Sequence, residues 1–482
     1  MCIRDRFDEE DNEDNDGLFD DQFNTELKRF EEMIETQNAY YFDSEILEQI
    51  IEHFIINNQL KKGLKAADFA KRQHPSNIVF DLRKAQILST TGQLKESLLI
   101  LQELEKLEPY NPEIFITKAS VFSQLRDHAK AVKYFEKAIE VAQELNYAEE
   151  IEEICFDLAM EHESMHNYSK AIKVLEDILK KSPDNEAAIY EIAYCYERTG
   201  NFDKCIEYYN KYINNNPYSF TAWYNLGNIY FLKNNIEKAL WAYDYSTIIN
   251  DDFASAHFNM GNVYMQIQDY EKALKSYQKC AVIDANDALT LSYLGEAYER
   301  LERYEQAIEC YQKSREINPD IAEPWLGTGI ILELKGETTE AINFIQQAVQ
   351  LQPENSNYRL VLGEALYKAD RMTEAETELE RAVQLDPNYS DAIVLLARIK
   401  SEFNLNEALE FLLSLENLAQ LEPQVRIILT TIFWKLGQKT EALLHFKKEY
   451  LIDKGSTKTL FLYLPEAEFI PEFLQIIETD NE

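Results

Sequence analysis

Apolar and polar positions recur along this chain with a period of 34 residues. The stretch AWYNLGNIYFLKNNIEKALWAYDYS begins at Ala222. The stretches AHFNMGNVYMQIQDYEKALKSYQKC and TLSYLGEAYERLERYEQAIECYQKS, which begin at Ala256 and Thr290, repeat its pattern. A fixed period of this length indicates a chain of repeated helix–turn–helix units.

Small residues mark the start of the second helix in each repeat. This column comprises Gly63, Ser97, Ala131, Ala171, Cys205, Ala239, Ala273, Ala307, Ala341, Ala375, Ala408 and Ala442. Its members are 34 residues apart except for a step of 40 from Ala131 to Ala171 and a step of 33 from Ala375 to Ala408. The longer step places six inserted residues around the sequence VAQELNYAEE.

Two further sets of residues, each at equivalent positions of successive repeats, are typical of paired helices. Glycines stand where the two helices of a repeat cross closely, and prolines, which lack an N–H, stand where second helices end. The glycines are Gly227, Gly261, Gly295, Gly329 and Gly363; the prolines are Pro183, Pro217, Pro319, Pro353 and Pro387. Since one such unit cannot bury its apolar face alone, neighbouring units must stack.

The pattern resembles the tetratricopeptide repeat family, whose unit reads W-x2-L-G-x2-Y, then A-x3-F, then P. One unit here carries Trp223, Leu226, Gly227, Tyr230 and Ala239 at those positions. The resemblance covers residues 44–456 and implies an all-α fold, a right-handed α-solenoid of about twelve 34-residue repeats. The layout also resembles long-array bacterial proteins of this family.

The ends of the chain differ from the repeats. The first residues, MCIRDR, resemble a translated sequencing adapter, and DEEDNEDND follows within an acidic stretch. We expect residues 1–25 to be this start and a disordered acidic tail, and residues 26–43 to be a capping helix. Residues 44–456 form the repeat array. Residues 457–482 are expected to form short helices that cap its far end.

Charge and cysteine usage narrow the function. The formal net charge of −38 argues against nucleic-acid phosphates and anionic membrane surfaces as partners. Neutral or basic proteins and peptides remain as possible partners. Six cysteines without a CxxC pair suit a reducing cytoplasm, and no apolar run is long enough to span a membrane. We expect a cytoplasmic protein that is monomeric or weakly self-associating.

The stretch HESMH raises an alternative function. His162, Glu163 and His166 match the HExxH signature of zinc peptidases, in which two imidazoles bind a metal and the glutamate is the general base. The repeat register assigns His162 to an inward packing column, Glu163 to a column facing the groove, and His166 to the turn. The two histidines are therefore not expected on one helical face, and we expect no metal site, no cofactor and no catalytic residue.

In the resembling family, first helices line a concave groove that binds peptide segments. The groove columns are richest in the middle of this array, at Tyr190, Tyr194, Tyr224, Asn225, Asn228, Phe231, Phe258, Asn259, Asn262, Met265 and Gln266. Asparagine amides can hold a peptide backbone whatever its sequence, and aromatic side chains can anchor apolar groups. The alternative is that the aromatics pack in the core and the asparagines serve the local backbone.

Asparagine occupies these two positions in only two successive repeats, as Asn225 and Asn228 and then as Asn259 and Asn262. In the next repeat the equivalent residues are Tyr293 and Glu296. A second kind of site is a basic clamp for a C-terminal carboxylate, with Arg198, Arg300 and Lys368 in one column. The sequence thus predicts a non-catalytic scaffold or adaptor for protein partners. The alternatives are the metal-dependent peptidase and a purely structural assembly factor.

Overall fold

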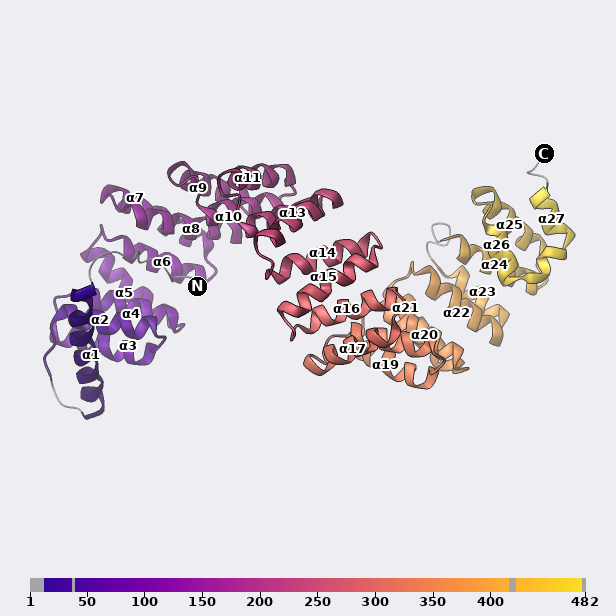
Figure 1. The fold of residues 1–482 in the computed structure, drawn as a ribbon, viewed down its shortest axis with the longest axis horizontal. Helices are drawn as coiled ribbons and strands as arrows, with labels where there is room; N and C mark the ends of the chain where they lie inside the picture. Colours follow the sequence, from indigo (N-terminus) through magenta and orange to yellow (C-terminus); the bar gives the residue numbers. More distant parts are fainter. Residues whose placement is uncertain (1–12, 37–39, 416–421, 479–482) are drawn as a thin grey trace. The chain divides into compact units, whose positions relative to one another are not determined.

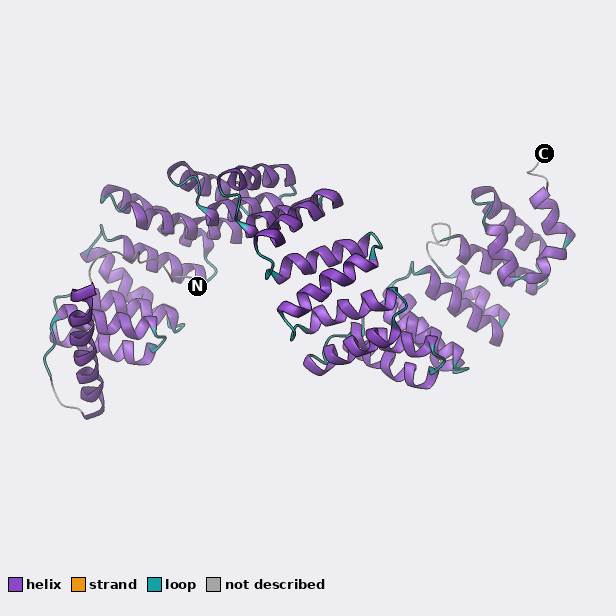
Figure 2. Cartoon of the chain, in the orientation of Figure 1, coloured by secondary structure: helices purple, strands orange, loops and turns teal. Residues whose placement is uncertain are grey.

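The computed structural model describes residues 13–36, 40–415 and 422–478 of the chain. Within these residues it contains 27 α-helices, one short 3-10 helix and no strand (Figure 1; Figure 2). The prediction of an all-α solenoid of paired helices is confirmed. In the same ranges, every helix is too short or too polar to cross a membrane. The helices form two compact units, Met1–Lys233 and Asn234–Glu482.

The first unit consists of a leading helix, five helix pairs and one further first helix. Its helices are α1 (Glu13–Thr36), α2 (Ser44–Ile56), α3 (Leu60–Gln73), α4 (Val79–Thr90), α5 (Leu94–Leu107), α6 (Pro112–Gln124), α7 (His128–Glu144), α8 (Ala148–Ser164), α9 (Tyr168–Lys181), α10 (Glu186–Arg198), α11 (Phe202–Asn215) and α12 (Phe220–Leu232).

The second unit begins with a second helix and continues with six helix pairs and a short terminal segment. Its helices are α13 (Ile236–Ile249), α14 (Ala254–Gln266), α15 (Tyr270–Ile283), α16 (Ala288–Arg300), α17 (Tyr304–Ile317), α18 (Glu323–Leu334), α19 (Thr338–Leu351), α20 (Ser356–Lys368), α21 (Met372–Leu385), α22 (Ser390–Phe403), α23 (Leu405–Leu413), α24 (Pro423–Lys435), α25 (Lys439–Ile452), α26 (Ser456–Tyr463), η2 (Pro465–Phe469) and α27 (Pro471–Glu478).

The backbone of the turns repeats with the same period as the sequence. In nearly every pair, one residue between the first and second helix has a left-handed φ, between 55° and 83°. These residues are Asn58, Gly92, Arg126, His166, Gly200, Asn234, Gln268, Glu302, Gly336, Asp370 and Gly437. Glycine and asparagine adopt this region readily, whereas other side chains cost about 1–2 kcal/mol there. The turn geometry is thus kept even where the residue type does not favour it.

The six inserted residues lengthen two helices. Helices α7 and α8 have 17 residues each, against 14 in the second helix α9 and 13 in the first helix α10. The loop between α7 and α8 has three residues, against four between α9 and α10. Helix α7 gains three residues, α8 gains four and the loop between them loses one, which together account for the six inserted residues. The insertion therefore extends the repeat by about one helical turn.

The column of small residues forms the centre of the packing. Ala171, Cys205, Ala239, Ala273 and their counterparts in the other repeats are fully buried. Each lies where the second helix meets the first, so a larger side chain would separate the two backbones.

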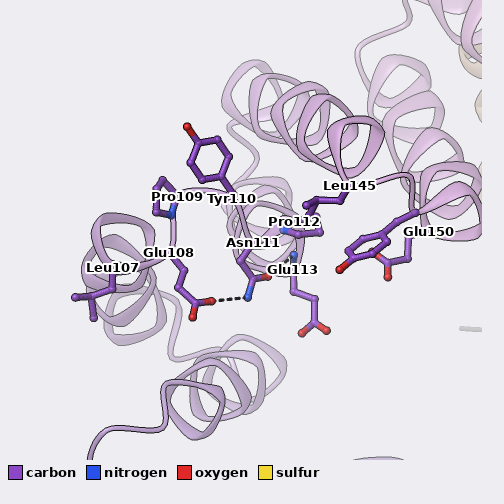
Figure 3. A pocket seen from close by; sticks show the side chains of 10 residues that line it. Leu107, Glu108, Pro109, Tyr110, Asn111, Pro112, Glu113, Leu145 and Glu150 are labelled. Carbon is purple, nitrogen blue, oxygen red and sulfur yellow. Dashed lines mark hydrogen bonds between the residues drawn. The ribbon is translucent and has the colours of Figure 1, made fainter.

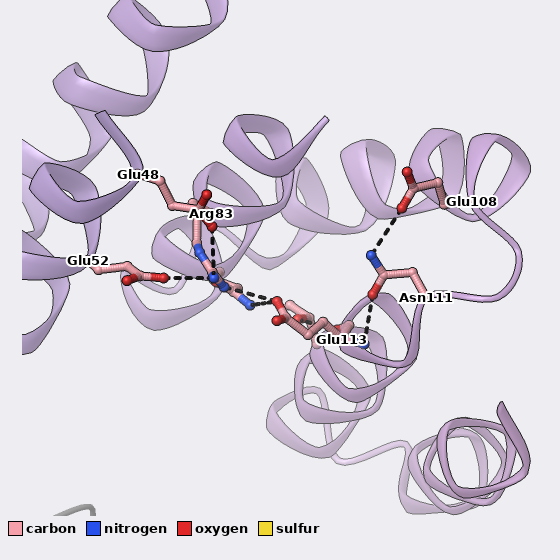
Figure 4. Close-up of polar contacts among 8 residues, drawn as sticks. Glu48, Glu52, Arg83, Glu108, Asn111 and Glu113 are labelled. Atoms are coloured by element: carbon pink, nitrogen blue, oxygen red, sulfur yellow. Dashed lines mark hydrogen bonds and ion pairs between the residues drawn. The ribbon is translucent and has the colours of Figure 1, made fainter. Parts of the chain in front are cut away.

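Arg83 joins three successive first helices of the first unit (Figure 4). Its guanidinium on α4 lies 3.3 Å from the carboxylate of Glu48 and 2.8 Å from that of Glu52, both on α2. It also lies 2.9 Å from the carboxylate of Glu113 on α6. Asn111, which accepts a hydrogen bond from the Glu113 amide, caps the start of α6. One cation thus forms ion pairs with three carboxylates from neighbouring repeats.

The N-terminal helix extends further than the sequence indicated. Helix α1 begins at Glu13, inside the stretch expected to be a disordered tail, and ends at Thr36 rather than at residue 43. Its Phe23 ring lies 5.6 Å from the ring of His53, and Phe30 is fully buried. These two apolar residues are seven positions apart, which is a helical spacing. Residues 1–12 of the expected tail lie outside the described residues.

The C-terminal segment covers the last pair. Helix α26, η2 and α27 pack with Phe446 and Tyr450 of α25 in one apolar cluster that includes Leu460, Leu464 and Phe473. Those residues would otherwise leave the final repeat with an open apolar face.

Candidate binding surfaces

The second unit carries an aromatic cluster on two neighbouring first helices. The ring of Phe258 on α14 lies 5.2 Å from the ring of Tyr293 on α16, edge to face. Both rings also lie 5.7 Å from the ring of Tyr277 on α15. Met265 packs against the same cluster. Phe258, Tyr293 and Met265 are half-buried, whereas Tyr277 is fully buried. These four side chains, together with Asn262 and Glu296, are called the α14/α16 surface.

Gly261 allows Tyr277 to reach this surface. A Cβ atom at position 261 would lie 2.4 Å from Tyr277 Cε1, so only glycine leaves room for the ring. The Tyr277 hydroxyl then donates a hydrogen bond to Asn262 Oδ1 over 2.7 Å. Because the amide oxygen is engaged, the N–H group is what Asn262 can offer to a ligand.

In the next repeat, a tyrosine again packs against a glycine and hydrogen-bonds a polar side chain, which here is a carboxylate. The Tyr311 ring lies between Gly295 and Gly327, where a Cβ atom on either glycine would be 2.5 Å from the ring. Its hydroxyl donates to Glu299 Oε2 over 2.7 Å. Burial raises the pKa of the Glu299 carboxyl, and the nearby charge of Glu296 acts in the same direction.

Carboxylates give this surface a negative potential. Glu296 is partly exposed and its Oε1 atom lies 3.5 Å from the Arg300 guanidinium. Burial raises the pKa of Tyr293, with further contributions from Glu296 and Glu323. The surface therefore combines rings, an amide donor and partly desolvated carboxylates, which suits a peptide segment with apolar and cationic side chains.

Sequence reasoning treated Tyr293 and Glu296 as a break in the asparagine pattern. It placed Glu299 in the groove-facing column of Glu163 but did not name it as a site residue, and it did not identify Tyr277. The sequence does contain a pattern that could have identified these tyrosines. A tyrosine follows the glycine at the helix crossing by 16 residues at Gly261 and again at Gly295. Only the packing shows that each such ring reaches a polar side chain on the first helix.

The remaining second-unit candidates are Asn259 and Gln266 on α14. Asn259 is half-buried and Gln266 is exposed. They extend the side of α14 that carries Asn262 and Met265, at helical spacing.

In the first unit, Tyr190 has a structural role. Its hydroxyl lies 2.6 Å from Thr221 Oγ1 and also contacts Glu186, so it ties α10 to the start of α12. Its ring packs 5.9 Å from the Tyr209 ring and 6.3 Å from the Tyr212 ring. Burial raises the pKa of Tyr190. This matches the alternative in which an aromatic side chain serves the core.

The other first-unit candidates lie on the first helices α10 and α12. Tyr194 is exposed, whereas Tyr224, Asn225, Asn228 and Phe231 are half-buried. The eleven predicted residues are thus divided between the two units.

The HESMH residues do not share a helical face. Helix α8 ends at Ser164, and His166 lies beyond it with a left-handed φ of 57°. His162 is buried, as its column predicted, and burial lowers its pKa. Glu163 was expected to face the groove, but this is wrong, because it is buried and accepts a hydrogen bond from Cys195 Sγ over 3.2 Å. Within the described ranges, no group of three metal-ligating side chains lies together.

The basic column has local partners. Arg198 Nε lies 3.4 Å from the Tyr168 hydroxyl. Arg300 contacts Glu296, and Lys368 forms an ion pair with Glu333. A carboxylate ligand would have to compete with these contacts, which disfavours the clamp.

Two cavities of the first unit border the inserted residues. One, of about 540 Å³, lies between the α5–α6 loop and the start of α8 (Figure 3). Tyr110 and Leu145 line it, as does Glu150, whose pKa is raised by burial and by Glu113. The other, of about 510 Å³, is lined by α7, α8 and α9, including Ile151 and Cys155. Sequence reasoning found the insertion but did not predict these cavities.

The repeated helix pairs and surfaces define a solenoid repeat protein, and comparisons with known proteins identify its kind. A family model described as tetratricopeptide repeat matches residues 112–145. A second model, described as the C-terminal domain of cilia and flagella-associated protein 70, matches residues 185–394. The chain belongs to the tetratricopeptide repeat family. Proteins of this family commonly bind protein or peptide partners.

Solved structures show similar chains. The Cut9-Hcn1 structure of the APC/C is 14% identical with a TM-score of 0.41, and the match covers 86% of this chain and 94% of that one. YrrB and MamA are each 22% identical with TM-scores of 0.33; the matches cover 38% and 35% of this chain and 95% and 98% of theirs. A search of curated proteins gives no match.

Proposed function

We propose that this chain is a non-catalytic scaffold that binds a segment of another protein on the α14/α16 surface. The observation that carries this proposal is the joint placement of the Phe258–Tyr293 ring pair and the Asn262 amide. The rings can anchor an apolar side chain while the amide N–H donates to a peptide carbonyl. This is a general way to hold a peptide whatever its sequence.

The partner is expected to be neutral or basic. Glu296 and Glu299 lie on the α16 side of the surface, and the whole chain has a formal charge of −38. Such a field attracts cationic segments and repels acidic ones. The described cysteines are unpaired thiols, which supports a cytoplasmic location for this encounter.

The proposal is tested with a phage-displayed library of random 12-residue peptides, selected on the immobilised full chain. Selected peptides are then labelled and their affinities measured by fluorescence polarisation. We expect basic peptides to be enriched. Asn262→Asp is the sharpest variant, because its carboxylate can still accept the Tyr277 hydrogen bond but cannot donate to a peptide.

We expect Asn262→Asp and Phe258→Ala each to weaken binding at least about tenfold, or about 1.4 kcal/mol. Glu340→Gln on α19, an exposed carboxylate on a second helix, is the matched control and should bind as the parent chain does. Equal affinity of all variants for the peptide would show that the binding site does not lie on α14 and α16. Failure to select any peptide would favour the purely structural assembly factor.

A further inference from the structure

Four large apolar side chains meet at the cavity of about 540 Å³ in the first unit (Figure 3). Leu107 ends α5 and Tyr110 lies in the α5–α6 loop, whereas Leu145 and Tyr147 lie in the α7–α8 loop. Their surfaces are 66%, 68%, 41% and 45% exposed, in the same order. Exposed apolar side chains that border one hollow are typical of a site where a partner docks. The hollow is called the Tyr110/Tyr147 cavity.

The packing of the repeat does not require these exposed side chains. The next loop between a second and a first helix, residues 182–185, consists of Ser, Pro, Asp and Asn. The α7–α8 loop differs from it, because the insertion shortens this loop to three residues, and two of them are Leu145 and Tyr147. The cavity is therefore a feature of the repeat that carries the insertion.

Three carboxylates line the same cavity. Glu108 accepts a hydrogen bond from Asn111 Nδ2 over 3.1 Å. Glu113 accepts one from Arg83 over 2.9 Å, and 45% of its side chain is exposed. Glu150, at the start of α8, is exposed and forms no hydrogen bond or ion pair with any other described residue.

The carboxylates of neighbouring repeats repel each other here. Burial raises the pKa of the Glu150 carboxyl, and the charges of Glu113 and Glu153 act in the same direction. Arg83 and Gln86 both contact Glu113 at Oε2, which leaves Oε1 as a second acceptor. A cation bound between Glu113 and Glu150 would relieve their repulsion.

The lysines closest in sequence to the cavity have carboxylate partners. Lys106, next to Leu107, is paired with Glu103 over 2.7 Å. Lys118 on α6 and Lys137 on α7 are both paired with Glu105. Helix α8 contains no lysine or arginine.

The remaining cations of these elements lie away from the cavity. Arg83 is shared among three carboxylates, and Lys84 beside it is paired with Asp68 over 2.6 Å. Lys180 and Lys181 on α9 line the other cavity. Five more cations lie about three helical turns or more from the cavity, at the opposite ends of α5, α6 and α7; they are Lys95, Arg126, His128, Lys130 and Lys133. The charge that complements the cavity is therefore positive.

We propose that the Tyr110/Tyr147 cavity binds an arginine side chain of a partner protein, in a segment that has apolar residues beside the arginine. A guanidinium suits the cavity, because its planar face stacks on tyrosine rings while its N–H groups donate to carboxylates. Glu113 and Glu150 are the acceptors, and the leucines at the rim contact the apolar neighbours of the arginine. The proposal is independent of the α14/α16 surface, which belongs to other repeats.

The experiment uses two labelled peptides with the full chain at about 150 mM NaCl, where exposed charges are screened beyond about 8 Å. Both peptides consist of serines and leucines around one central residue. That residue is arginine in one peptide and citrulline, its neutral isostere, in the other. Fluorescence polarisation measures both affinities. We expect the arginine peptide to bind at least about tenfold more tightly than the citrulline peptide.

Three variants locate the site. Glu150→Gln should weaken binding of the arginine peptide about tenfold and leave the citrulline peptide unchanged. Tyr110→Ser combined with Tyr147→Ser should weaken binding of both peptides, since the rings contact both. Glu96→Gln, which removes an exposed carboxylate at the start of α5, is the matched control and should change neither affinity. Far-UV circular dichroism checks that each variant keeps its helices.

Four outcomes would overturn the proposal. One is an arginine peptide that binds no more tightly than the citrulline peptide, or not at all. Another is an equal effect of Glu150→Gln and Glu96→Gln, which would indicate attraction by the net charge alone. The third is loss of binding in Phe258→Ala, which would place the peptide on the α14/α16 surface. The fourth is self-association of the parent chain in sedimentation that the serine pair removes, since a second copy would then be the occupant.

Discussion

Gly261 and Tyr277 show how one missing side chain lets a tyrosine from the next helix reach and position a polar group. The tyrosine crosses the first helix where the glycine leaves space, and its hydroxyl then fixes the Asn262 amide. The same relation links Gly295, Tyr311 and Glu299. In both repeats, a tyrosine that packs in the core also determines which hydrogen-bonding groups on the surface remain available to a ligand.

We expect Gly261→Ala to destabilise α14 and α15 by about 1–3 kcal/mol, because the added Cβ overlaps a fully buried ring. Long repeat arrays open locally, so hydrogen exchange of the amides in these two helices is the appropriate measurement. Gly63→Ala is the control. Its Cβ would meet the flexible end of Ile87 at 3.1 Å and should cost less. Equal costs would refute the role of the ring.

Glu299 provides a prediction about pH. Burial raises its pKa above the ordinary value of 4.5, so the folded chain holds this proton more tightly than the unfolded chain. Its contribution to stability is fully present below that ordinary value, which applies to the unfolded chain, and is lost as the pH rises through the folded pKa.

Glu299→Gln should therefore stabilise α16 and α17 at pH 7, since its amide oxygen can still accept the Tyr311 hydrogen bond. The gain should disappear below about pH 4, where the parent carboxyl is protonated in both states. Hydrogen exchange at both pH values measures it, with Glu340→Gln as the exposed control. A variant that is less stable at pH 7 would contradict the argument.

At the scale of elements, the repeats are joined by contacts between helices that are distant in sequence. The cation of Arg83 connects first helices of three repeats through Glu48, Glu52 and Glu113 (Figure 4). Similarly, the insertion acts through α7 and α8, whose extra turn borders two cavities. Both features depend on how a helix meets its neighbours rather than on its own sequence.

We expect Arg83→Met to destabilise α2, α4 and α6 by about 1–3 kcal/mol, because three carboxylates lose their common cation. The partial exposure of the glutamates keeps the cost below that of a fully buried pair. Lys84→Met removes an exposed ion pair with Asp68 and should cost about 0–1 kcal/mol. Urea denaturation followed by hydrogen exchange compares the two. A similar loss in both would show that the three-helix contact adds nothing.

At the scale of the whole molecule, the charge distribution dominates. The chain has 86 acidic and 48 basic side chains, and many of its ion pairs are exposed. Exposed pairs contribute little to stability, whereas a large net charge opposes compaction by self-repulsion.

We therefore expect the melting temperature to rise as NaCl increases from about 20 to about 300 mM, over which the screening length falls severalfold toward a few ångströms. Circular dichroism at 222 nm measures the transition. KCl at equal ionic strength is the control for specific ion effects. A melting temperature that falls with salt would show that attractive pairs outweigh the net repulsion.

The sequence by itself determined the all-α repeat, the position of the insertion and the fully buried column from Gly63 to Ala442. These follow from helical periodicity and residue size, which are local properties. It also predicted that His166 lies past the end of its helix, because the repeat register assigns that column to the turn.

Only the tertiary structure decided which candidate side chains are available. Tyr190 is held by Thr221 and Glu186, Glu163 is buried against Cys195, and Asn262 receives the Tyr277 hydroxyl. Each contact joins residues on different helices. Sequence spacing assigns a residue to a face, but the exposure and the hydrogen-bonding capacity that remain there depend on side chains that reach it from neighbouring helices.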